Sequence, residues 1–215
     1  FIKLDLNNLK NLQKILKKKY NFIFHCATYG QPQKWDGNEY STINLNTNVV
    51  KLILDHSKKY RSRVLFLSSA SVYEIPNGRK SLDENSPLGS GKFFGEKFYI
   101  ASKILGEQLC KMYKEKYNLP IFVGRPGHTY GPGQNLSDPR VIPQFIKRAI
   151  FEKKIYMFDK GKTVRTWTYI SDVIIMLLNI IQYGKSTIYN VCGKENISVL
   201  KIAKLISSKF ENIPV

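Results

Sequence analysis

The feature that most constrains the fold is an alternation of short apolar runs with longer segments of helical periodicity. Residues 22–27 (FIFHCA), 63–69 (RVLFLSS) and 119–126 (LPIFVGRP) are almost continuously apolar, which is typical of strands buried on both faces. Segments with apolar residues at helical spacing lie at 7–19, 41–59 and 98–117. This order of strands and helices predicts an α/β fold, a doubly wound parallel sheet covered by helices.

The composition and the order of the predicted elements change after residue 130. A Gly- and Pro-rich loop (GPGQNLSDP) is followed by a predicted helix at 140–151, strands at 155–158 and 164–169, a helix at 172–183, a strand at 187–191 and a helix at 198–209. Residue 1 already lies in an apolar run, FIKLDL, which we interpret as a strand, and the chain stops just after a helix. We therefore expect a chain that is cut at both ends.

Composition narrows the class of protein. No apolar run approaches the roughly 18 residues that a membrane span needs, and no signal peptide is visible. Cys26, Cys110 and Cys192 are few, odd in number and far apart, so they predict neither a metal site nor a disulfide framework. The expected setting is a reducing, cytoplasmic one, without a membrane partner.

The net charge of +18 raises the question of a nucleic-acid partner. The excess is mostly Lys spread along predicted helices, whereas nucleic-acid sites more often combine Arg with exposed aromatic residues. The pattern favours a solvated Lys-rich surface and no nucleic-acid partner. Two alternatives stay open: a field that attracts an anionic substrate, and a polyanion binder.

The predicted parallel sheet points to where ligands bind. In such sheets ligands lie outside the carboxyl ends of the strands. Four places follow from that rule: Cys26-Ala27-Thr28, Ser68-Ser69, the segment 124–128, and whatever follows Leu4-Asp5.

A Tyr-x-x-x-Lys pair stands in the segment FYIASK. On a helix Tyr99 and Lys103 share one face about a turn apart. A nearby cation favours a phenolate and lowers the pKa of a tyrosine, which could then take a proton from an alcohol while a hydride leaves the same carbon. The alternative is a half-exposed aromatic ring beside a solvated Lys. A second match, Tyr156 and Lys160, lies in a predicted strand and turn, where the two side chains cannot cooperate.

Ser69 adds weight to the first pair. It ends an apolar strand at the expected ligand-binding edge, where its hydroxyl could hydrogen-bond a reacting oxygen. A Ser that only caps the following turn is the alternative. The combination of this Ser with Tyr99 and Lys103 is more specific than either motif alone.

Taken together, these motifs resemble the extended short-chain dehydrogenase/reductases, specifically the NAD-dependent epimerase/dehydratase group that acts on nucleotide-sugars. The resemblance implies NAD as cofactor, with NADP left open, and a nucleotide-diphosphate sugar as partner. It implies a Rossmann-like domain at 1–130 that lacks its first strand-helix-strand, with the cofactor's Gly-rich loop upstream of residue 1. Residues 131–215 would hold nucleotide-sugar-binding and late Rossmann elements, part of a smaller substrate domain.

The resemblance also assigns residues. The implied catalytic residues are Ser69, Tyr99 and Lys103. The implied cofactor-binding residues are Asp5 and Leu6 near the adenine, Cys26, Ala27 and Thr28 near the ribose and phosphates, Asn46, Ser68, Tyr99 and Lys103, and Pro126 and Gly127 on the nicotinamide side. The implied substrate-binding residues are Ser69, Ala70, Ser71 and His128, with Arg140 and Arg165 at the base or diphosphate; salt bridging at the surface is the alternative for both Arg residues.

Two departures from the family pattern narrow the chemistry. Ala70 and Ser71 stand where the dehydratases carry an Asp-Glu pair and the glucuronate decarboxylases a Glu, and His128 stands where Asn is usual. We therefore expect an epimerase that works through a 4-keto sugar. The alternatives are an enzyme like the UDP-glucuronate decarboxylases and a non-catalytic member or fragment. Homodimerisation through 41–59 and 98–117 is implied by the resemblance alone.

Overall fold

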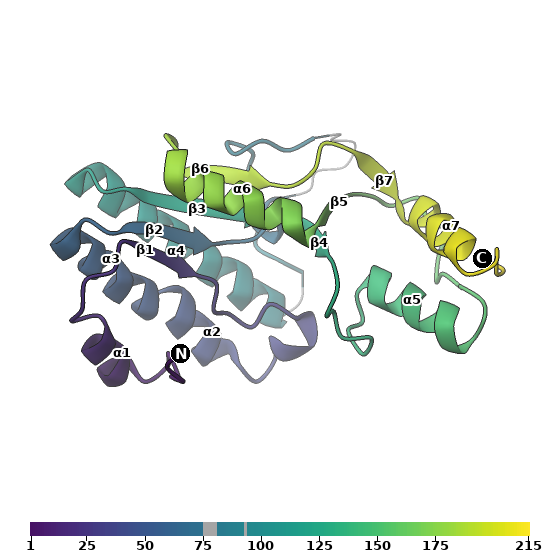
Figure 1. Ribbon diagram of the computed structural model, residues 1–215, viewed down its shortest axis with the longest axis horizontal. Helices are drawn as coiled ribbons and strands as arrows, with labels where there is room; N and C mark the ends of the chain where they lie inside the picture. The colour runs from purple at the N-terminus through teal and green to yellow at the C-terminus, as the bar shows by residue number, and fades with distance from the viewer. Residues whose placement is uncertain (75–80, 93) are drawn as a thin grey trace. The chain divides into compact units, whose positions relative to one another are not determined.

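The computed structural model describes residues 1–74, 81–92 and 94–215 (Figure 1). The chain divides into two compact units. The first unit comprises Phe1–Pro126 and Ile175–Val191, and the second comprises Gly127–Ile174 and Cys192–Val215. We expected one division at residue 130, whereas the chain passes to the second unit after Pro126 and returns to the first for Ile175–Val191.

The first unit contains a four-stranded parallel sheet. Its strands are β1 (Phe22–His25), β2 (Arg63–Leu67), β3 (Ile121–Pro126) and β6 (Ile188–Val191), in the order β1-β2-β3-β6. The register pairs Leu65 with Phe122 and Gly124 with Tyr189. The α/β class and the parallel sheet predicted from the apolar runs are therefore confirmed.

Helices cover both faces of this sheet. In the first unit, α2 (Glu39–Asn46), α3 (Asn48–Tyr60) and α4 (Phe94–Tyr117) lie on one side, and the part of α6 (Ile170–Tyr183) that belongs to this unit lies on the other (Figure 1). The short α1 (Leu9–Ile15) precedes β1, and the 3-10 turns η1 (Pro32–Lys34) and η2 (Ala70–Val72) follow β1 and β2. None of the helices in the described ranges combines the length and apolar character that crossing a bilayer demands.

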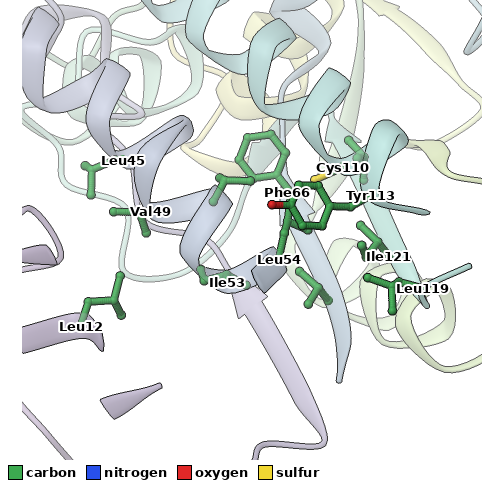
Figure 2. Close-up of a cluster of buried hydrophobic side chains, with 13 residues drawn as sticks. Leu12, Leu45, Val49, Ile53, Leu54, Phe66, Cys110, Tyr113, Leu119 and Ile121 are labelled. Carbon is green, nitrogen blue, oxygen red and sulfur yellow. The ribbon is translucent and has the colours of Figure 1, made fainter. Parts of the chain in front are cut away.

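The main core lies between the sheet and α3 and α4. Successive side chains of a strand point to opposite faces, so Val64 and Phe66 of β2 enter this core while Leu65 is buried on the other face. Figure 2 shows the cluster, to which α1 and α2 also contribute. It is built from Leu12, Leu45, Val49, Val50, Ile53, Leu54, Val64, Phe66, Cys110, Tyr113, Leu119, Ile121 and Val123.

The strand expected in the FIKLDL segment is not formed. Residues 1–5 have neither helix nor strand geometry, and Asp5 accepts a hydrogen bond on its carboxylate from the Asn7 backbone N–H at 2.9 Å. Leu4 and Leu6 pack against the main core instead. The expectation was wrong because apolar character reports burial, whereas a strand also needs a neighbouring strand to accept its backbone hydrogen bonds.

The helix expected at 41–59 is two helices. Thr47 separates α2 from α3 with a backbone φ of −125° and ψ of −72°, and its hydroxyl donates to the Ile43 carbonyl at 2.7 Å. A Ser or Thr that bonds back to the preceding turn competes with the helical ladder and bends it. The break ends α2 at Asn46.

The second unit has a smaller sheet of three strands. β4 (His128–Tyr130) pairs parallel with β5 (Val164–Tyr169), which pairs antiparallel with β7 (Asn196–Ser198). Helices α5 (Val141–Phe151) and α7 (Val199–Lys209) share a core, to which Ile142, Phe145, Ala149, Ile202 and Ala203 contribute.

Residues 155–158 do not form the expected strand. The ring of Tyr156 lies 3.8 Å from the Arg148 guanidinium, and the Arg148 side chain also donates to the Tyr156 carbonyl at 2.5 Å. This contact with α5 takes the place of pairing with another strand. The three-residue strands β4 and β7 were not predicted from the sequence.

Candidate active site

Tyr99 and Lys103 lie one turn apart on α4, and both are buried, with 5% and 1% of their surface exposed. The Lys103 ammonium donates to the carbonyl of Leu67, the last residue of β2, at 2.7 Å. It also lies 4.8 Å from the ring centroid of Phe66 and 5.8 Å from that of Tyr99. The alternative of a half-exposed ring beside a solvated Lys therefore does not describe this pair.

Ser69 lies beside the phenol at the carboxyl end of β2. Its hydroxyl hydrogen-bonds the Tyr99 side chain and also caps η2 by accepting from the Ser71 backbone N–H at 3.1 Å. Ser69 therefore caps the following turn and also contacts Tyr99, while its hydrogen bond to a reacting oxygen stays a prediction. Ala70 and the exposed Ser71 form this turn and bring no carboxylate to it.

A glycine lets α4 approach the sheet closely. A Cβ on Gly106 would lie 2.6 Å from the Asn46 carbonyl oxygen and 2.7 Å from the Phe66 ring, closer than van der Waals contact allows. Asn46, at the end of α2, donates from its side chain to Ser102 at 3.0 Å and to Thr28 at 3.3 Å. It thereby links α4 to the segment after β1.

Burial sets the protonation of the pair. It raises the pKa of Tyr99, and the hydrogen bond from Ser69 opposes that effect. We expected Lys103 to lower the pKa of Tyr99. The pKa of Tyr99 is raised instead, so that expectation is wrong. Burial also lowers the pKa of Lys103 from 10.5 to about 7, while the Cys26 thiol and the Glu107 carboxylate act in the opposite direction. Both groups thus resist their charged forms because water is excluded.

A buried ion pair joins the elements that carry the site residues. Glu107 follows Lys103 by one helical turn, is fully buried, and binds the Arg125 guanidinium at 2.5 and 2.9 Å. The Ser68 hydroxyl donates to the same carboxylate at 2.5 Å, and Arg125 donates to the Tyr73 phenol at 2.8 Å. This network ties the ends of β2 and β3 to α4. We did not predict this network from the sequence, although an Arg inside an apolar run was a usable signal.

Trp35 also contacts the site, and no motif in the sequence predicted it. Its ring stacks on Tyr99 with centroids 4.7 Å apart and planes inclined by 17°, and its indole N–H donates to the Tyr29 carbonyl at 2.8 Å. Gly95 permits this approach, because a Cβ there would lie 2.3 Å from an Asp36 carboxylate oxygen. Nothing local in the sequence signals a contact over this separation.

The donor set at Lys103 suits the sugar hydroxyls of a dinucleotide. The ammonium has three N–H donors and one hydrogen bond to the described residues, while the buried Oδ1 of Asn46 accepts none from that part of the chain. The N–H donors of Lys103 that remain and the Oδ1 acceptor of Asn46 match the hydroxyl groups of a ribose. Cys26, Ala27 and Thr28 follow β1 at the same edge of the sheet.

Other predicted cofactor residues differ in their surroundings. Asp5 is exposed and its carboxylate is turned onto the Asn7 backbone, while Leu6 is packed against the core. Pro126 ends β3 at the same sheet edge as Ser68. Within the described ranges, no three His, Cys, Asp or Glu side chains gather as a metal site would require.

The second unit contains the remaining predicted site residues, which are Gly127, His128, Arg140 and Arg165. The His128 ring lies 5.2 Å from that of Trp167, and desolvation together with the charges of Arg165 and Arg140 lowers the pKa of His128. Arg140 binds the buried Asp138 carboxylate at 2.6 and 3.0 Å. That contact matches the salt-bridge alternative for Arg140.

The fold and the Ser-Tyr-Lys cluster define a Rossmann-like chain of the short-chain dehydrogenase type. A family model, described as the NAD dependent epimerase/dehydratase family, matches residues 1–192. The chain belongs to this family, whose members are NAD-dependent enzymes acting on nucleotide-sugars.

Individual relatives differ in activity. The chain is 25% identical over 207 residues to a dTDP-4-dehydro-6-deoxy-D-allose reductase of Streptomyces bikiniensis. The match covers 94% of this chain and 63% of the reductase. It is also 25% identical to UDP-glucuronic acid decarboxylase 1 of Xenopus tropicalis, over 86% of this chain and 44% of that protein. The chain thus spans under two thirds of the length of these relatives.

A solved structure extends the comparison. The UDP-glucuronic acid 4-epimerase of Bacillus cereus, in complex with UDP-glucuronic acid and NAD, superimposes with a TM-score of 0.79 at 26% identity. The match covers 97% of this chain and 64% of the epimerase. The parallel sheet and its helices are therefore those of the family.

Proposed function

We propose that this chain is the catalytic part of an NAD-dependent nucleotide-sugar epimerase that works through a 4-keto sugar. The observation that carries the proposal is the cluster at the carboxyl end of β2, where Ser69 hydrogen-bonds Tyr99 and Lys103 lies buried one turn further along α4. In this arrangement the Tyr99 phenol, the Ser69 hydroxyl and the Lys103 ammonium can act together on one hydroxyl group of a sugar.

In the proposed reaction the chain moves a proton at the sugar 4-hydroxyl. Tyr99 accepts that proton as a phenolate, and Ser69 hydrogen-bonds the same oxygen. Since burial raises the pKa of Tyr99, the phenolate needs positive charge beside it. Lys103 supplies that charge when it is protonated.

NAD fits the hydrogen-bonding groups of Lys103 and Asn46 at the carboxyl ends of the strands. When bound, it supplies the hydride acceptor and donor for C4, and its oxidised ring carries a positive charge. We propose that Lys103 and Asn46 contact the ribose nearest that ring. Asp5, Leu6, Cys26, Ala27, Thr28, Ser68, Pro126 and Gly127 remain proposed cofactor contacts, and NADP remains an open alternative. For a nucleotide-diphosphate sugar, Ser69, Ala70, Ser71, His128, Arg140 and Arg165 remain proposed contacts. Homodimerisation also stays a proposal.

A decarboxylase-like activity is the second candidate, and the relatives include such enzymes. The turn formed by Ala70 and Ser71 argues against it and against a dehydratase, because that turn offers no carboxylate as a second acid or base. The absence of an acidic side chain there favours epimerisation, in which one proton acceptor serves both directions.

The test is to incubate a protein that contains this chain together with the family's Gly-rich cofactor loop with NAD and a panel of UDP- and dTDP-sugars, and to follow the C4 configuration by NMR. We expect epimer formation by the wild type. Tyr99→Phe should lower the rate by about three orders of magnitude, in the range that a lost acid-base group and its positioning supply, and should leave NAD affinity unchanged. Tyr156→Phe is the matched control and should keep the rate.

Three outcomes would contradict the proposal. Near-normal turnover by Tyr99→Phe would remove the assigned base. Release of carbon dioxide from UDP-glucuronic acid would favour the decarboxylase instead. A wild-type chain that binds NAD and sugar without turnover would favour a non-catalytic member.

A further inference from the structure

The edge of the sheet opposite the Ser-Tyr-Lys cluster is strongly basic. In a parallel sheet all strands begin at one edge, so β1, β2, β3 and β6 each start there, after the ends of α1, α3, α4 and α6 respectively. Cationic residues occupy each of these helix ends or the following turns. They are Lys17, Lys18, Lys19, Lys58, Lys59, Arg61, Arg63, Lys114, Lys116 and Lys185. We call this set the basic edge.

Contacts join the four helix ends into one surface. The Tyr60 phenol of α3 donates to the Lys17 carbonyl after α1 at 2.7 Å. Arg61 donates to the Tyr117 carbonyl at the end of α4 at 3.3 Å. The Lys114 ammonium of α4 donates to the Lys185 and Ser186 carbonyls after α6 at 3.2 and 2.9 Å. The basic edge is therefore continuous within the first unit.

A depression that is open to solvent, with a volume of about 570 Å³, lies in the basic edge, and we call it the cavity. Four of its lining side chains are cationic, and they come from three different helix ends and from the start of β2. They are Arg61, Arg63, Lys114 and Lys185, and the rest of the lining is Asn118, Leu119, Pro120, Phe122 and Gly184. Among the described residues, none that lines the cavity is acidic.

The positive charges of the cavity are not balanced by carboxylates. The ion pairs found in the described ranges involve Lys51, Lys111, Arg125 and Arg140, which lie elsewhere. Lys114 and Arg63 are bonded to backbone carbonyls instead. Consistently, burial and the charge of Arg63 lower the pKa of Lys114. Helix ends provide only about half a negative charge each, too little for ten cations.

The aromatic rings of the basic edge argue against nucleobases as ligands. Arg63 and Lys114 lie 5.1 and 4.6 Å from the Phe122 ring centroid. Tyr117 is similarly approached by Lys58 at 4.1 Å and Lys116 at 5.6 Å. Rings that are occupied by cations offer no platform on which bases can stack. The surface is suited to phosphate groups alone.

We propose that the cavity lined by Arg61, Arg63, Lys114 and Lys185 is a binding site for a small anion that carries two or more phosphate groups. The guanidinium groups of Arg61 and Arg63 and the Lys185 ammonium can donate to phosphate oxygens with charge assistance. Lys114 contributes positive charge alone, because its three N–H groups donate to the carbonyls of Ile121, Lys185 and Ser186. The site lies at the opposite ends of the strands from Ser69, Tyr99 and Lys103. It is independent of the proposed catalytic function.

The test is isothermal titration of the chain with sodium tripolyphosphate, comparing Lys185→Glu with Lys204→Glu. Both variants change the net charge equally, and Lys204 is an exposed residue of α7 outside the basic edge. We expect Lys185→Glu to weaken binding at least about tenfold, because it removes one lining cation and adds a repelling charge. Lys204→Glu should change the affinity less than about twofold, and Lys185→Arg should retain it.

Three results would overturn the proposal. The first is that wild-type protein fails to bind tripolyphosphate. The second is that both charge-reversed variants lose affinity equally, which would mean only general attraction to a basic chain. A single-stranded RNA that binds more tightly than tripolyphosphate and responds to Lys185→Glu would assign the edge to nucleic acid instead. None of these readouts depends on turnover, so they stand apart from the test of the catalytic proposal.

Discussion

At the residue scale, Lys103 is a side chain whose pKa its buried surroundings bring close to neutral pH. Burial lowers its pKa from 10.5 to about 7, so the folded chain releases this proton at a lower pH than the unfolded chain does. Between pH 7 and 10.5 the unfolded state binds more protons, and stability therefore rises with pH. Below pH 7 the full cost of burying the ammonium is present.

This linkage predicts a pH-dependent difference between wild type and Lys103→Met. From pH 6 to pH 9 the wild type should gain on the order of 2 kcal/mol in unfolding free energy relative to the variant. Urea denaturation at both pH values measures it. Lys97→Met, at an exposed position of the same helix, should follow the wild type. Parallel pH profiles for wild type and Lys103→Met would refute the lowered pKa.

The pair of Glu107 and Arg125 gives a second prediction. Arg125→Met leaves a fully buried carboxylate without its cation and should cost about 3–5 kcal/mol of stability. The double variant Glu107→Met with Arg125→Met should cost less than the single Arg125→Met, because no charge is then left uncompensated. Denaturant titrations of the four proteins in the cycle measure this coupling. Lys51→Met, in an exposed pair, should cost under about 1 kcal/mol. Additive effects would contradict the argument.

At the scale of elements, α4 depends on its approach at Gly106. A Gly-to-Ala change inside a helix ordinarily stabilises it by about 0.5–1 kcal/mol. At Gly106 the added carbon meets the Asn46 carbonyl and the Phe66 ring, so Gly106→Ala should instead destabilise by about 1–3 kcal/mol. Thermal and urea unfolding measure the sign. Gln108→Ala, at an exposed position of α4, should be neutral, and a stabilised Gly106→Ala would show that the contact is not tight.

The sequence predicted the long elements better than the short ones. Runs such as 63–69 are apolar because both faces of β2 are covered, and that burial leaves a direct mark in composition. Strand pairing leaves none, so FIKLDL was misjudged and the three-residue β4 and β7 were overlooked. The backbone break at Thr47 arises from one side-chain hydrogen bond, which helical periodicity does not record.

The site shows the same limit. Tyr99 and Lys103 were found because helical spacing brings them together within one element. Trp35 and Arg125 reach the site from other elements through tertiary packing, and no local pattern encodes such contacts. The direction of the Tyr99 pKa shift was misjudged for the same reason, since burial depends on the whole fold.

At the scale of the whole molecule, the net charge of +18 opposes compaction. Exposed ion pairs are few in the described ranges, with Lys51–Asp55 and Lys111–Glu115 the examples, so salt has little attraction to screen. Raising NaCl from about 0.02 to about 0.5 M should increase the melting temperature. Differential scanning calorimetry measures this, and Lys204→Glu, which carries less charge, should gain less. A melting temperature that falls would show that attraction dominates.

The two tryptophans of the chain fall one in each unit, Trp35 in the first and Trp167 in the second. Trp35→Phe therefore leaves a fluorophore that reports on the second unit alone, and Trp167→Phe leaves one that reports on the first. Trp35 lies against Tyr99, so its emission also registers events at the phenol. The molecule thus carries two separable optical labels without chemical modification.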